Sequence, residues 1–256
     1  MNNKARGFFG ERPLPTFEVD SQVLCRRTRR DFLLFGAGAL AAVAGARSLL
    51  PHALRIDDDV SELLYSPHRM VPTYTKSQIT PLKNNYNGAT PDSGYISAWH
   101  LTLDGLASGL SVALDIRSLM SRFPVHEQIT RLVCVEGWSA IAWWAGLRFD
   151  DLIRAYPPAS QAKWVRVESS VNLDVSGRPD PYYVSLDLTT ARHPQTLLAT
   201  HLNGQTLTVE HGAPLRLLAP VKLGLKNVKA VTRLEYFAGE PKDYWAQRGY
   251  SHYDGI

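Results

Sequence analysis

Cysteine is scarce in this chain, which has only Cys25 and Cys134 among its 256 residues. A disulfide framework, or a zinc or iron–sulfur site made of protein thiolates, needs several cysteines at set spacings, and the sequence has no CxxC or CxxCH pair. The composition therefore excludes a disulfide-rich fold, a protein-ligated iron–sulfur cluster and a covalently attached c-type haem.

An excess of one charge sign is also missing from most of the chain. The formal net charge is +4, but residues 1–46 contain seven Lys/Arg against four Asp/Glu, which leaves 21 basic and 20 acidic residues in the remainder. A nucleic-acid-binding protein keeps its basic excess on the folded part. We therefore expect no nucleic-acid partner.

The amino-terminal region carries paired arginines, Arg26-Arg27-Thr-Arg29-Arg30, followed by Phe-Leu-Leu and a weakly apolar run rich in alanine and glycine. Small residues at 42–46 are typical of a signal-peptidase site. This pattern is typical of a twin-arginine signal peptide over residues 1–46. An uncleaved membrane-spanning helix, or retention of the segment as a membrane anchor, is the alternative.

The predicted signal carries chemical information, because the twin-arginine machinery exports proteins in the folded state. Folded export is needed when a bulky cofactor must be inserted in the cytoplasm. We therefore expect a periplasmic, cofactor-containing protein, with membrane association through the amino-terminal segment or a partner as an alternative.

The remaining chain divides into an extended lead-in at 47–80 and a folded domain at 81–256. Helices are expected at Leu114–Phe123 and over Ser139–Leu147 with Phe149–Ala155, interrupted at Gly146. The strand candidates are Tyr95–Leu103, Gln128–Val135, Trp164–Val167, Tyr182–Leu186, Leu197–Leu202, Thr206–Val209, Leu215–Leu218 and Val228–Phe237. Short strands with few short helices predict an α+β fold built on mixed β-sheets.

Cys134 lies near the end of a β-prone run that enters a glycine-containing loop, in the sequence RLVCVEGWS. As a thiolate it would be a soft ligand for a transition metal or a nucleophile. The simpler alternative is a small buried hydrophobic residue. The residues alone leave these three roles open.

The segment Cys134–Ser139 resembles the molybdenum-ligand segment of the sulfite oxidase superfamily, and it is most similar to the branch of the periplasmic methionine-sulfoxide reductase catalytic subunit. Three further segments resemble the same family in the same order. They are Asn84-Asn85, Leu188–Ala199 with its His-Pro pair, and His211–Lys229 with its Gly-Ala-Pro-Leu-Arg motif. Together the four segments span roughly residues 80 to 240.

The resemblance implies a sulfite-oxidase-type molybdopterin-binding fold over residues 81–256, with molybdopterin and molybdenum as the cofactor. Cys134 would be the catalytic residue and the protein ligand to the metal. The implied cofactor contacts are Asn84, Asn87, Gly88, Ser169, His211, Arg216, Asn227, Val228 and Lys229.

Physical chemistry agrees with these roles, because a dianionic dithiolene with a phosphate tail requires cations and N–H donors. Arg216 and three lysines, Lys222, Lys226 and Lys229, are expected to supply them.

The sequence departs from the family pattern in the region expected to face the substrate. His211 stands where the family has asparagine, and the excursion at Ser170–Pro181 is short for this branch. Where sulfite oxidases place an arginine after the metal cysteine, this chain has Trp138, Trp143 and Trp144. The tryptophans are expected either in the core or along a less polar substrate funnel.

Three function hypotheses follow. The first is a molybdenum oxidoreductase that performs two-electron oxygen-atom transfer on a small or protein-bound S- or N-oxide. It would exchange electrons with a separate haem protein, either a membrane subunit or a soluble cytochrome. The second, motivated by His211 and the short excursion, is a non-catalytic cofactor-binding or scaffold subunit of the same fold. The third is a periplasmic cysteine hydrolase acting through Cys134.

Overall fold

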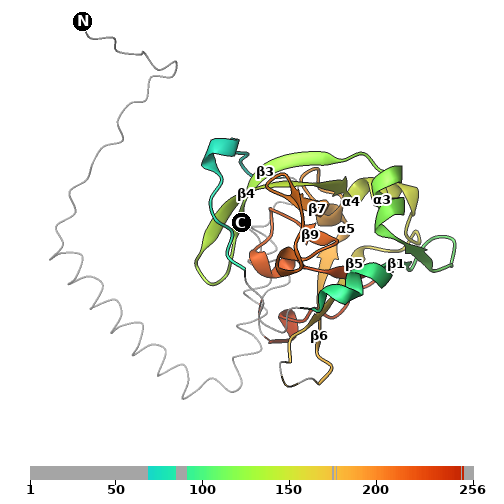
Figure 1. The fold of residues 1–256 in the computed structure, drawn as a ribbon. Helices are drawn as coiled ribbons and strands as arrows, with labels where there is room; N and C mark the ends of the chain where they lie inside the picture. The colour runs from blue at the N-terminus through green and yellow to red at the C-terminus, as the bar shows by residue number, and fades with distance from the viewer. Residues whose placement is uncertain (1–68, 85–90, 175, 177, 249, 251–256) are drawn as a thin grey trace, which may run out of the picture. The chain divides into compact units, whose positions relative to one another are not determined.

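The computed structural model describes residues 69–84, 91–174, 176, 178–248 and 250. They form two β-sheets accompanied by short helices (Figure 1), so the predicted α+β class with mixed sheets is confirmed. The predictions for residues 1–68, and those for Asn87 and Gly88, lie outside the described residues. Within the described part of the chain, no helix is long and apolar enough to cross a bilayer.

The first sheet has the strand order β2-β1-β10-β5-β6. Its strands are β1 Leu101–Asp104, β2 Val112–Leu114, β5 Trp164–Asn172, β6 Pro181–Asp187 and β10 Val231–Phe237. The pair β1 and β10 is parallel, whereas the other neighbours are antiparallel. The long sequence separation of β1 and β10 brings the two ends of the domain together in one sheet.

The second sheet has the order β3-β4-β7-β8, with β9 also paired to β7. Its strands are β3 His126–Val133, β4 Ser139–Arg148, β7 Leu197–Leu202, β8 Gln205–Thr206 and β9 Arg216–Leu218. All of these pairings are antiparallel. The turn between β3 and β4 follows Cys134, so the longest hairpin of the sheet presents this residue.

Three short α-helices and five 3-10 segments connect the strands of the described chain. The α-helices are α3 Ile116–Arg122, α4 Phe149–Ala155 and α5 Leu188–Ala191. The 3-10 segments are η1 Lys76–Gln78, η2 Ser93–Ala98, η3 Val209–His211, η4 Gly224–Lys226 and η5 Ala246–Arg248. Aspartates cap two of the α-helices: Asp115 accepts from the Ser118 N–H and Asp187 from the Thr190 N–H.

The main hydrophobic core joins the two sheets. It contains Leu103, Val167 and Leu234 from the first sheet and Leu198 and Leu217 from the second, all fully buried. Burying a side chain of this size contributes about 1.5–3 kcal/mol to folding. The strands that carry the candidate site are therefore held on a rigid base.

One predicted helix is wrong. Ser139–Leu147, expected to be helical up to a break at Gly146, is strand β4. It lies between β3 and β7 and pairs with both, so backbone hydrogen bonds on its two sides override the helix preference of alanine. The helices expected at 114–123 and 149–155 are confirmed as α3 and α4.

Two segments predicted as strands are partly 3-10 helix. In the segment Tyr95–Leu103 the first half is the 3-10 helix η2, whose start is fixed by Asp92 accepting from the Gly94 N–H at 2.6 Å. Only the second half belongs to β1. Similarly, the strand expected at 206–209 ends at Thr206, and η3 follows.

Gly146 in β4 is required by a close approach to β7, because a Cβ at this position would lie 2.2 Å from the Leu198 carbonyl oxygen. We predict that Gly146→Ala lowers the free energy of unfolding by about 1–3 kcal/mol through overpacking. Urea denaturation measures this change. Gly239→Ala is the control, since a Cβ there meets nothing within 4 Å. Equal stability of the two variants would contradict this account of β4.

Candidate functional site

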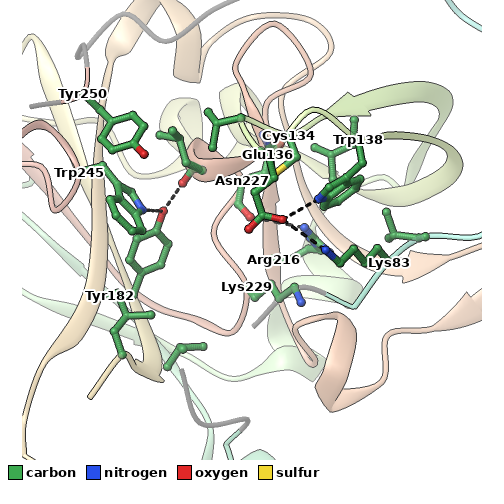
Figure 2. A pocket seen from close by; sticks show the side chains of 17 residues that line it. Lys83, Cys134, Glu136, Trp138, Tyr182, Arg216, Asn227, Lys229, Trp245 and Tyr250 are labelled. Atoms are coloured by element: carbon green, nitrogen blue, oxygen red, sulfur yellow. Dashed lines mark hydrogen bonds and ion pairs between the residues drawn. The ribbon is translucent and has the colours of Figure 1, made fainter. Parts of the chain in front are cut away.

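A pocket of about 230 Å³ opens at the turn between β3 and β4. Four of the residues predicted for the site line it: Cys134, Arg216, Asn227 and Lys229. Cys134 comes from the turn after β3, whereas Arg216 in β9 and the two residues after η4 come from a stretch much later in the sequence (Figure 2). The fold therefore brings the predicted thiol and two predicted cations into one cavity.

Cys134 follows the last residue of β3 and is 8% exposed. Its N–H donates to the Trp138 carbonyl at 2.9 Å, and its carbonyl accepts from the Gly137 N–H at 3.1 Å. Across the pocket wall, a Cβ added to Gly224 would lie 3.3 Å from the Cys134 Cα. The turn and the neighbouring η4 thus hold the backbone of Cys134 from two sides.

Arg216 is 2% exposed and lies at the start of β9. Its guanidinium donates to the His211 carbonyl at 3.0 Å and to the Asn227 carbonyl at 3.4 Å. It also lies 4.8 Å from the ring centroid of Trp144, at cation–π distance. These neutral contacts orient the side chain and leave it positively charged in the pocket wall.

Lys229 approaches the same pocket from the segment before β10. Its Nζ donates to the Asn84 side-chain oxygen at 3.0 Å and to the Glu210 carbonyl at 2.8 Å. Gly212 allows this approach, because its φ is +96° and a Cβ would lie 2.8 Å from the Lys229 Cβ. Asn84 does not line the pocket and contacts the site through Lys229.

The electrostatics of the pocket fit an anion. Burial, and then the charge of Arg216, lower the pKa of Lys229 to about 7 from its ordinary value of 10.5. Burial, and then Arg216 and Lys229, likewise lower the pKa of His211. An anionic group in the pocket would reverse both shifts. A buried arginine and a half-buried lysine beside a buried thiol suit a negatively charged ligand that carries a soft metal.

Other predicted contacts support this arrangement without lining the pocket. The Ser169 hydroxyl donates to the Lys229 carbonyl at 2.6 Å and accepts from the Val171 N–H at 2.9 Å. Val228 is fully buried in the main core. The His211 ring has a buried Nδ1 that makes no hydrogen bond within the described residues. These three residues shape the segment that carries the cations.

Asn227 lines the pocket, but its side chain is engaged with the backbone. Its Oδ1 accepts from the Ala219 N–H at 2.7 Å, and its Nδ2 donates to the Leu223 carbonyl at 2.9 Å. The residue thus closes the loop between β9 and η4. Since its side-chain amide is already hydrogen-bonded, Asn227 would contribute to ligand binding through the shape of this loop.

The prediction that Lys222 and Lys226 bind the anion is wrong. Lys222 and Lys226 are 1% and 0% exposed and do not line the pocket. Lys226 instead forms an ion pair with Asp243 at 2.6 Å, both side chains being fully buried. Of the cations expected in this segment, Arg216 and Lys229 are the ones that reach the pocket.

The three tryptophans occupy different environments. Trp138 lines the pocket, where its Nε1 donates to Glu136 Oε2 at 3.0 Å. Trp144 is fully buried in a second core cluster, and Trp143 packs under the Lys76 ammonium at 3.5 Å. One of the three thus lies along the pocket, as a funnel would require, while Trp144 belongs to the core.

Sequence reasoning did not find the other side of the pocket. Tyr182, Trp245 and Tyr250 line it from β6 and from the carboxyl-terminal segment. Lys83 and Glu136, 3.4 Å apart, lie at its edge. Trp245 and Tyr250 follow the last segment that resembles the family, so no motif pointed to them. The aromatic residues around position 245 were the sequence signal that could have indicated an apolar pocket wall.

Comparison with known proteins assigns this geometry to a class. The family model of the oxidoreductase molybdopterin-binding domain matches residues 87–245. YedZ1 of Azospira oryzae, proposed by its name to be a protein-methionine-sulfoxide reductase subunit, is 34% identical over 205 residues, covering 78% of this chain and 74% of that protein. MsrP of Campylobacter jejuni, named as the catalytic subunit of protein-methionine-sulfoxide reductase, is 30% identical over 248 residues, covering 89% and 79%.

Among solved structures, the sulfane dehydrogenase SoxCD of Paracoccus pantotrophus has a similar fold, with a TM-score of 0.52 and 20% identity. The match covers 71% of this chain and 48% of that one, so the chain spans about half the length of the SoxCD chain. This likeness confirms the sulfite-oxidase-type fold that the sequence resemblance implied.

Fold and pocket together define a molybdenum-cofactor enzyme of the sulfite oxidase type. The chain belongs to the oxidoreductase molybdopterin-binding domain family. It is an oxidoreductase with molybdopterin and molybdenum as its cofactor, which agrees with the first function hypothesis and not with the scaffold subunit or the cysteine hydrolase.

The depressed pKa of Lys229 gives a pH prediction. Sulfate should bind to the cofactor-free chain more tightly at pH 6 than at pH 8, by up to about tenfold, because Lys229 loses its proton as the pH rises through about 7. Isothermal titration calorimetry measures the affinity. Lys229→Met should weaken this pH dependence and leave only the part due to His211, whereas Lys163→Met, at an exposed position, should retain it in full. Equal sulfate affinity of the native chain at both pH values would contradict the prediction.

Proposed function

We propose that this oxidoreductase acts on a small or protein-bound S- or N-oxide by two-electron oxygen-atom transfer, with Cys134 as the protein ligand to molybdenum. The observation that carries the proposal is the presence of the Cys134 thiol, Arg216 and Lys229 in one pocket. A sulfoxide is favoured as the substrate because the relatives MsrP and YedZ1 are named as protein-methionine-sulfoxide reductases.

The residues of the pocket have separate roles in this proposal. Cys134 supplies a thiolate, and Arg216 and Lys229 balance the negative charge of the pterin group, with Asn84 orienting the Lys229 ammonium. Asn227 and Val228 position the backbone of the loop that joins Arg216 to Lys229. Ser169 donates to the Lys229 carbonyl and fixes it. When bound, the cofactor supplies the two-electron redox chemistry that moves an oxygen atom.

The edge of the pocket holds Trp138 beside the space proposed for the substrate. Glu136 accepts hydrogen bonds from both the Trp138 indole and the Lys83 ammonium, which joins the Cys134 turn to the segment before Asn84. Trp138 is thereby held over the pocket in a fixed orientation. The Trp138 ring suits the apolar substituent of a neutral sulfoxide better than an oxyanion, because an aromatic side chain cannot replace the hydration of a charge.

We further propose a periplasmic location and a separate redox partner. The paired arginines and the alanine-rich run of residues 26–46 support export in the folded state by the twin-arginine machinery. With no sequence motif for a second redox centre in the chain, the two electrons would be exchanged with a haem-containing membrane subunit or a soluble cytochrome.

The ligand role of Cys134 predicts a change in the coordination of the metal. In Cys134→Ser, X-ray absorption at the molybdenum edge should show one sulfur ligand fewer than in the native protein, and reduction of dimethyl sulfoxide should be lost. Val135→Ser, at the next position of the same loop, is the control and should keep the native sulfur count. An unchanged sulfur count in Cys134→Ser would rule out Cys134 as the ligand.

The export proposal is tested by replacing Arg26, Arg27, Arg29 and Arg30 with lysine, which keeps the positive charge. The protein should then move from the periplasmic to the cytoplasmic fraction, because the export machinery recognises the arginine pair itself. Cell fractionation with immunodetection measures the distribution. Arg12→Lys should leave export unchanged. Undiminished periplasmic protein in the fourfold variant would refute the twin-arginine route.

A further inference from the structure

The carboxyl-terminal segment Asp243–Tyr250 forms a second side of the pocket. Figure 2 shows Tyr182, Trp245 and Tyr250 together on one side, opposite Cys134, Trp138 and the two cations. We call Tyr182 and Trp245 the aromatic wall. Because this wall lies on the side of the pocket opposite Arg216 and Lys229, it contributes shape and apolar surface to the part of the pocket that the cofactor-binding groups leave open.

A buried ion pair fixes the start of this segment. Asp243 is fully buried, and its Oδ2 accepts from Lys226 Nζ at 2.6 Å and from the Ser185 N–H at 2.8 Å. Burial alone would raise the pKa of Asp243, but Lys226 and these hydrogen bonds keep it below its ordinary value. The carboxylate therefore stays charged and retains its partners.

Asp243 also fixes the residue that forms the wall. Its Oδ1 accepts from the Trp245 N–H at 3.0 Å, directly next to the indole that lines the pocket. The Trp245 Nε1 donates to the Tyr182 hydroxyl at 3.2 Å, and that hydroxyl in turn donates to the Leu225 carbonyl. The backbone and the side chain of Trp245 are therefore both held.

These contacts connect the wall to the cofactor side of the pocket. Leu225 and Lys226 belong to η4, whose first residue, Gly224, packs against Cys134. The wall is attached to η4 twice, once through Tyr182 and once through Asp243. The distance between the thiol and the aromatic wall is thus set by one short, rigid segment.

We propose that Trp245 is a specificity-determining residue that favours sulfoxides with an aryl or other large apolar substituent, and that Asp243 is a positioning residue that sets Trp245 through its pair with Lys226. The substrate class rests on the proposed function. An indole face stacks on an aromatic ring and gains little from a methyl group, so the wall discriminates by the substituent and not by the oxide.

The test compares two substrates of the holoenzyme, methyl p-tolyl sulfoxide and dimethyl sulfoxide, with reduced benzyl viologen as the one-electron donor. Each turnover takes two viologen electrons and two protons, breaks the S–O bond, and releases the sulfide and one water. Trp245→Ala should lower the ratio of kcat/KM for the aryl over the dimethyl substrate by roughly threefold to tenfold. Trp245→Phe should restore most of it.

Trp143→Ala is the matched control, because Trp143 packs under Lys76 and does not line the pocket. It should leave the substrate ratio unchanged. A ratio that is the same in Trp245→Ala as in the native enzyme would overturn the specificity role, as would an equal fall in the Trp143→Ala control.

The positioning role is tested with Asp243→Asn, which keeps the shape of the side chain and removes its charge. The substrate ratio should fall toward that of Trp245→Ala, and the double variant should show no further fall, because the two residues act in series. Additive effects of the two substitutions would refute a role of Asp243 through Trp245. If Asp243→Asn does not accumulate as folded protein, the same cycle is measured with Lys226→Met.

A binding measurement separates this inference from the proposed function. Without reductant, methyl p-tolyl sulfoxide should bind the oxidised holoenzyme in calorimetry, with affinity lowered roughly threefold to tenfold in Trp245→Ala. Binding of this kind without any turnover would reject the proposed function and keep the wall. Turnover of both sulfoxides with no effect of Trp245→Ala on ratio or binding would reject the wall and keep the function.

Discussion

Two positive charges in one largely buried pocket are the constraint on which the rest of the site depends. Burial, and then the positive charge of Arg216, lower the pKa of Lys229 to about 7. The chain keeps them together with neutral oxygens from the His211, Asn227 and Glu210 carbonyls. Such an arrangement costs stability in the free protein and becomes favourable when an anion binds.

The fold provides this arrangement through segments rather than single residues. Arg216 lies in β9, and the loop closed by Asn227 leads from there to Lys229. The chain then enters β10, the middle strand of the first sheet. Gly212 lets the preceding loop touch Lys229, which a side chain at that position would prevent. The cofactor-binding groups therefore share one continuous stretch of chain, while Cys134 arrives from the opposite hairpin.

The sequence predicted the chemical groups of the site better than their surroundings. Cys134, Arg216 and Lys229 could be found because each stands in a motif whose order and residue types match one anionic, metal-carrying ligand. Lys226 was expected in the same role, but its partner Asp243 lies outside any motif, and only the fold brings the two together. For the same reason the contribution of Trp245 could not be predicted.

The secondary structure shows the same division. The helices α3 and α4 follow from local signals, such as the Asp115 cap and the Pro157-Pro158 stop after α4. Strand β4 does not, because its alanines favour a helix and its state is decided by pairing on both sides. The state of β4 and the role of Lys226 thus depend on contacts between residues far apart in the sequence, which a local sequence pattern does not predict.

The central claim is that the Cys134 thiol and the cations Arg216 and Lys229 face one cofactor. Anomalous diffraction at the molybdenum edge, from crystals of the protein purified with its native cofactor, tests it directly. The account predicts a molybdenum peak bonded to Cys134 Sγ, with the pterin group in contact with Arg216 and Lys229. A molybdenum position away from Cys134, or a pterin group that contacts neither cation, would contradict it.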